Sequence, residues 1–199
     1  MPPPVLTVPA LRIQDYKNRE GPMAPWLHSY LEGGLSAAEL LPPYKGLYLF
    51  VARIYSFDQA VVSQWLEHFS PERDFSRLVS ERIRARLEEV PPAEQYGAYY
   101  DETVKAAYLF SFRGVRRLDD SWVQGTVSAA DSPRFPAEPM YWGFILMSIP
   151  KDTLEIQVSG LLDDVENSIE REHGRRAREA SREHRTAFAN VKEQFFEHF

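Results

Sequence analysis

Cysteine is absent from this chain of 199 residues. Its absence excludes disulfide staples, thiolate zinc sites, iron–sulfur clusters and cysteine nucleophiles. No run of about 18 consecutive apolar residues occurs, which is the length that a membrane-spanning helix requires. The sequence therefore predicts a protein without disulfide bonds and without a transmembrane helix. Cysteine usage alone does not distinguish a cytoplasmic from a periplasmic location.

Glycine is scarce as well, and only Gly33 and Gly34 are adjacent among ten scattered glycines. The chain has no GxGxxG, no GxxxxGK[ST], no GxSxG elbow and no HExxH motif. A phosphate-cradling loop is therefore not expected. We predict a protein that is not an enzyme and binds no cofactor, with a site assembled from distant residues as the open alternative.

The chain offers two kinds of side-chain group as candidates for a chemical site. Glu170 and His173 form one E-x-x-H step, whereas a di-iron bundle needs two such steps and two further glutamates. His184 is about 16 Å from His173 along a helix, at ~1.5 Å per residue, which is too far for a shared metal. Asp119 and Asp120 are adjacent on an expected strand, so their carboxylates point to opposite faces and do not converge easily. The pair Asp163–Asp164 lies on the polar side of the expected last helix. Both pairs are therefore expected to have turn or solvation roles. The prediction is no catalytic residue and no metal site.

The charge balance is acidic, with 23 Lys and Arg, 29 Asp and Glu, and a net charge of −6. This argues against a nucleic-acid partner, because such binding depends on clustered cations that neutralise phosphates. Residues 171–185 hold six arginines and three glutamates, for which salt bridges within a helix are the simplest explanation.

Hydrophobic periodicity predicts the elements. A largely buried strand is expected over 44–55, then a helix that begins at a Ser56-to-Gln59 capping box, then a second helix from Ser70-Pro71 to before Pro91. A third helix is expected over 93–112, whose last residues are either helical or extended. Further strands are predicted at 118–128 and at 140–149, the latter central in the sheet because it is almost entirely apolar.

The last element is expected to be a long amphipathic helix beginning near Pro150, with an apolar stripe that keeps its phase across Gly174. Leu154–Ile169 is expected to pack on the sheet, while the aromatic end has no obvious partner within a domain of this size. Gly174 is a possible break, which would let the end fold back on the core. The predicted protein-interaction residues are those of the aromatic end: Phe188, Val191, Phe195, Phe196 and Phe199.

Three strings carry a resemblance to a known group: LYLFVARIYSFDQAVVSQWLEHF, VKAAYLFSFRGVRRLDDSWVQ and YWGFILMSIPKDTLEIQV. Over about residues 45–165 the chain resembles the mature domain of bacterial envelope lipoproteins, in which "DxWV"-like and "SIPKDxLExQ" steps occur at the corresponding strands. The resemblance implies a membrane-tethered, non-enzymatic domain in envelope structure or assembly. The chain departs from the group because it has no lipobox or signal sequence and because its last helix continues beyond the usual end.

Together these patterns predict an α+β fold: a small, mainly antiparallel sheet with helices packed on one face and a long C-terminal amphipathic helix. The predicted organisation is an irregular Pro-rich segment 1–44 that docks through a short helix near Trp26, a core domain 45–170 and a helical extension 171–199. The predicted function is non-catalytic protein interaction or envelope structure, with self-association through the C-terminal helix as one option. The alternative is a small acidic, immunity-type inhibitor that captures a basic protein. Periplasm or cell envelope is expected if the resemblance holds and cytoplasm otherwise, with membrane attachment only through a lipid anchor absent from this chain.

Overall fold

The computed structural model describes residues 11–17, 21–89, 97–127 and 138–173. The chain divides into two compact units. The first, called unit 1 below, contains the described residues of 1–71 and 115–150. The second, unit 2, contains those of 72–114 and 151–173, so the chain passes between the units three times.

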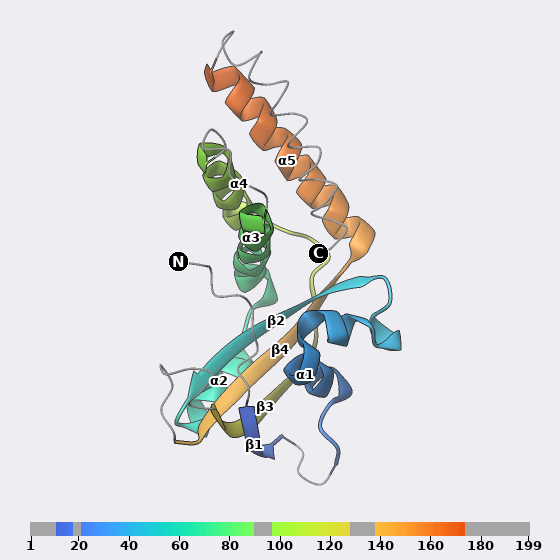
Figure 1. Ribbon diagram of the computed structural model, residues 1–199, viewed down its shortest axis with the longest axis vertical. Coiled ribbons are helices and arrows are strands. Elements are labelled where there is room, and N and C mark those ends of the chain that lie inside the picture. The colour runs from blue at the N-terminus through green and yellow to red at the C-terminus, as the bar shows by residue number, and fades with distance from the viewer. Residues whose placement is uncertain (1–10, 18–20, 90–96, 128–137, 174–199) are drawn as a thin grey trace. The chain divides into compact units, whose positions relative to one another are not determined.

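Unit 1 is built on a four-stranded antiparallel sheet with strand order β1-β3-β4-β2 (Figure 1). The strands are β1 (Leu11–Tyr16), β2 (Leu47–Ser56), β3 (Arg116–Val127) and β4 (Met140–Pro150). β4 lies between β2 and β3 and is buried along nearly its whole length. This confirms the central position that its apolar composition predicted, because a strand buried on both faces gains nothing from alternating polar residues.

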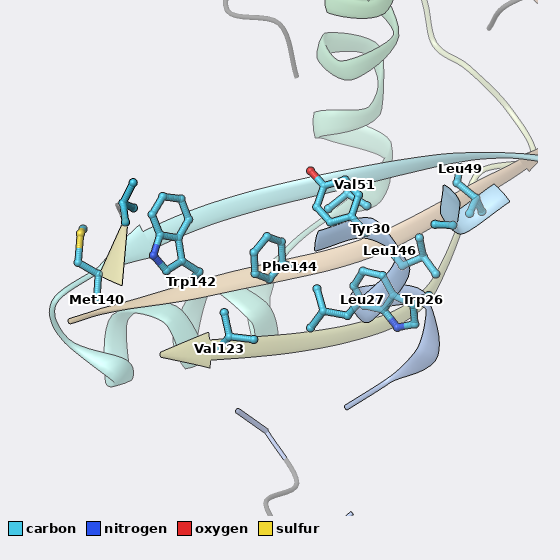
Figure 2. Close-up of a cluster of buried hydrophobic side chains, with 12 residues drawn as sticks. Trp26, Leu27, Tyr30, Leu49, Val51, Val123, Met140, Trp142, Phe144 and Leu146 are labelled. Atoms are coloured by element: carbon cyan, nitrogen blue, oxygen red, sulfur yellow. The ribbon is translucent and has the colours of Figure 1, made fainter. Parts of the chain in front are cut away.

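Helix α1 (Pro25–Glu39) covers one face of this sheet. Trp26, Leu27 and Tyr30 pack there against the even-numbered side chains of β4, among them Phe144 and Leu146, as Figure 2 shows. Gly34 interrupts the helix with φ 72° and ψ −164°, a conformation that residues with a Cβ rarely adopt. The short helix expected near Trp26 is therefore longer than predicted, with a kink at Gly34 and a further helical stretch beyond it.

Helix α2 (Gln59–His68) covers the opposite face. A Cβ placed on Gly143 of β4 would lie 2.7 Å from Val62 Cγ1, so the glycine allows α2 to approach β4 closely. The α+β class and the antiparallel sheet are therefore confirmed. The expectation that helices pack on one face is corrected, because α1 and α2 lie on opposite faces of the sheet.

The start of α2 differs from the predicted capping box. Asp58 is the N-cap and its Oδ1 accepts a hydrogen bond from Ala60 N–H at 2.8 Å. Ser56 Oγ accepts from Asp58 N–H at 3.1 Å and belongs to the end of β2. Because β2 continues through Ser56, the helix begins later and an aspartate takes the capping position.

Strand β1 was not predicted, since residues 1–44 were expected to be irregular apart from one short helix. A β-bulge between Ile13 and Asp15 shifts the register with β3, and this interrupts the alternation that identifies a strand in a sequence. Gly125 of β3 makes the pairing possible, because a Cβ there would lie 2.6 Å from Arg12 O. The described part of the N-terminal segment thus belongs to the folded unit.

Unit 2 contains the helices α3 (Pro71–Glu89), α4 (Gly97–Leu109) and α5 (Lys151–His173). α3 begins at Pro71 as predicted, and the end of the third predicted helix is extended from Phe110 onward. Within unit 2, α5 packs against α4, and its expected packing on the sheet of unit 1 stays a prediction. Its predicted apolar stripe is buried at Leu154, Val158, Leu161, Leu162 and Val165.

Candidate functional site

The predicted interaction residues Phe188, Val191, Phe195, Phe196 and Phe199 lie outside the described residues, as do Gly174 and His184. Glu170 and His173 lie in the last turns of α5. The carboxylate pair Asp163–Asp164 lies on the exposed side of the same helix.

The other carboxylate pair, Asp119–Asp120, lies just after a bulge in β3, and its two side chains have different surroundings. Asp119 Oδ2 accepts a hydrogen bond from Trp26 Nε1 at 2.7 Å, while Asp119 Oδ1 accepts one from Asp120 N–H at 2.8 Å. Asp120 forms ion pairs with Lys17 Nζ and, at 2.9 Å, with Arg117 Nη2. The two carboxylates diverge, as the alternation of a strand requires.

These surroundings change two pKa values. Burial acts to raise the pKa of Asp120, but the hydrogen bonds and positive charges of Lys17 and Arg117 outweigh it and the net pKa is lowered. Burial, together with the charge of Asp119, raises the pKa of Tyr44. Asp120 is therefore held as the anion, which is the state of a structural ion pair and not of a proton donor near neutral pH.

The described residues hold no metal-binding group of three or more His, Asp or Glu side chains. His28 Nδ1 lies 3.1 Å from Glu32 Oε2, one turn later in α1. His68 Nδ1 lies 2.8 Å from the backbone oxygen of Gln64 in the same helix. Over the same residues no helix is both long and apolar enough to cross a membrane.

One flank of α2 brings together three apolar side chains that are not fully buried. At about 100° per residue, the large apolar residues Val61, Val62, Trp65 and Leu66, together with the C-cap residue Phe69, span roughly 140° around the helix axis. Val62 and Leu66 are in the core, whereas Val61 is 45% exposed and Trp65 and Phe69 are half-buried. The rings of Trp65 and Phe69 meet edge to face with centroids 5.1 Å apart. We call Val61, Trp65 and Phe69 the α2 flank.

The periodicity of the sequence places all five of these residues on one face of the helix. A face of this width is ordinary for a helix packed on a core, so the periodicity alone does not distinguish the exposed residues from the buried ones. Large hydrophobic side chains are exposed at other described positions too, and several of them are more exposed than Val61: Ile13, Leu40, Tyr55, Phe57, Tyr108, Leu109, Leu118 and Ile156. Single exposed apolar residues are ordinary at protein surfaces.

Both edges of the sheet have features that disfavour the addition of another strand. Glu39 Oε1 accepts a hydrogen bond from Leu49 N–H of edge strand β2 at 2.9 Å, so this donor is already occupied. At the other edge, β1 has only six residues, contains the bulge and carries the exposed Arg12. A partner that binds the sheet through backbone pairing is thus less favoured than one that binds through side chains.

No protein-family model, curated protein or solved structure matches the chain.

Proposed function

We propose that the protein is a non-catalytic protein-interaction module and that the α2 flank is a surface on which a protein partner docks. The observation that carries the proposal is the partial exposure of Val61, Trp65 and Phe69 on a helix whose neighbouring residues are buried in the core. A rigid helix anchored by Val62 and Leu66 presents these side chains in a fixed geometry.

The chemistry of the flank suits recognition of a protein. Tryptophan and phenylalanine are enriched at the centres of protein interfaces, where a few large side chains supply most of the binding energy. An aromatic pair already held edge to face loses little rotational freedom when a partner covers it, so more of the burial energy appears as affinity.

The proposal is tested by site-specific photo-crosslinking in the source cells. A benzophenone amino acid in place of Val61 is expected to form a defined covalent adduct with one protein. The matched control places it at Ser63, which is exposed on the other side of α2. Identical adducts from both positions, or none from position 61, would contradict the proposal.

The acidic inhibitor remains the second candidate because the chain has a net charge of −6. An inhibitor that captures a basic protein depends on long-range attraction, so its association rate falls steeply with salt. Docking on the α2 flank depends on apolar burial and is expected to change little between 50 and 300 mM salt, on the order of a few-fold. The salt dependence of association with the crosslinked partner separates the two functions.

Two earlier expectations stay as proposals beside this one. The first is a role in the bacterial envelope, and the test is fractionation of cells that express the native gene.

The second is self-association through Phe188, Val191, Phe195, Phe196 and Phe199. Light scattering of the full chain and of a chain that ends at residue 173 tests it, and equal masses at high concentration would contradict it.

A further inference from the structure

We draw no further inference here: the strongest candidate, the apolar flank of α2 formed by Val61, Trp65 and Phe69, already carries the proposed function and nothing in the structure shows which partner covers it.

Discussion

Trp26 and Asp119 are 93 residues apart in the sequence and are joined by a hydrogen bond of 2.7 Å between the indole N–H and a carboxylate oxygen. The bond connects the first turn of α1 to β3. Trp26 is almost completely buried, so its indole ring packs in the core while its single polar atom reaches the carboxylate at the edge of that core. This contact fixes where along the sheet α1 begins.

Replacing Asp119 with alanine is therefore expected to destabilise unit 1 by about 1–3 kcal/mol, because the buried indole N–H loses its acceptor. Trp26→Phe removes the donor but keeps an aromatic ring in the core. In a double-mutant cycle measured by urea unfolding, Asp119→Ala is expected to cost much less in the Trp26→Phe background. Additive costs would show that the hydrogen bond does not contribute.

The ion pairs of Asp120 predict a pH-dependent stability. Its pKa is lowered in the folded protein, so its stabilising contribution is present above the unfolded pKa, about 3.8, and is lost as the pH falls through the folded value. Asp120→Asn is expected to be less stable than the unmodified protein at pH 7, with a difference that shrinks below about pH 4. Denaturant unfolding from pH 3 to pH 7 measures this.

The control for that experiment is Glu32→Gln, since the Glu32 side chain is 71% exposed on α1. This substitution is expected to leave stability within about 0.5 kcal/mol at every pH, as for most surface changes. A destabilisation by Asp120→Asn that is independent of pH would contradict the assignment of Asp120 as a charged partner of Lys17 and Arg117.

Gly143→Ala tests the close packing of α2 on the sheet. The added Cβ would lie 2.7 Å from Val62 Cγ1 and 3.2 Å from Ile54 Cγ2, so α2 or β4 has to shift. We expect a loss of about 1–3 kcal/mol, typical of an overpacked core. Combining it with Val62→Ala is expected to recover part of that loss, because the smaller side chain removes the nearest atom.

Gly160→Ala is the matched control for this glycine. Gly160 lies inside α5, and apart from the adjacent residues and backbone of its own helix nothing lies within 4 Å of the added Cβ. Alanine has the higher helix propensity, so this substitution is expected to stabilise the protein by about 0.5–1 kcal/mol. Equal destabilisation at both positions would mean that steric contact with α2 is not the cause.

The α2 flank and the buried face of α2 are expected to respond differently to substitution. Val61→Ser is expected to change the free energy of unfolding by less than about 1 kcal/mol, because Val61 is 45% exposed, and to weaken partner binding. Leu66→Ala leaves a cavity in the core and is expected to cost about 2–5 kcal/mol. Thermal unfolding, followed by titration with the crosslinked partner, measures both effects. A Val61→Ser protein that binds normally would exclude Val61 from the interface.

A fragment of residues 45–170 is expected not to fold. It lacks β1 and α1, so the sheet face that Trp26, Leu27 and Tyr30 cover would be open to water. Circular dichroism and cooperative unfolding of this fragment, compared with residues 11–173, give the readout. A cooperative transition in the shorter fragment would show that its sheet is stable without the N-terminal segment.

Much of the secondary structure could be predicted from local patterns. β2, β3 and β4 were predicted to within a few residues, because a run such as MYWGFILMSI is short, rich in aromatic residues and isoleucine, and bounded by Pro139 and Pro150. α3 was predicted to begin at Pro71 because proline at the first helical position needs no backbone donor. Each of these signals lies within about ten residues of chain.

By itself, then, the sequence determined the α+β class, the central position of β4 and the absence of cysteine chemistry. Only the tertiary structure decided that α1 and α2 cover opposite faces, that bulged β1 completes the sheet, and that Asp119 and Asp120 serve different partners. The physical reason is the distance along the chain over which each kind of interaction acts. Periodicity and capping act between near neighbours, whereas the pairing of Leu11 with Val127 or of Trp26 with Asp119 depends on how distant segments meet.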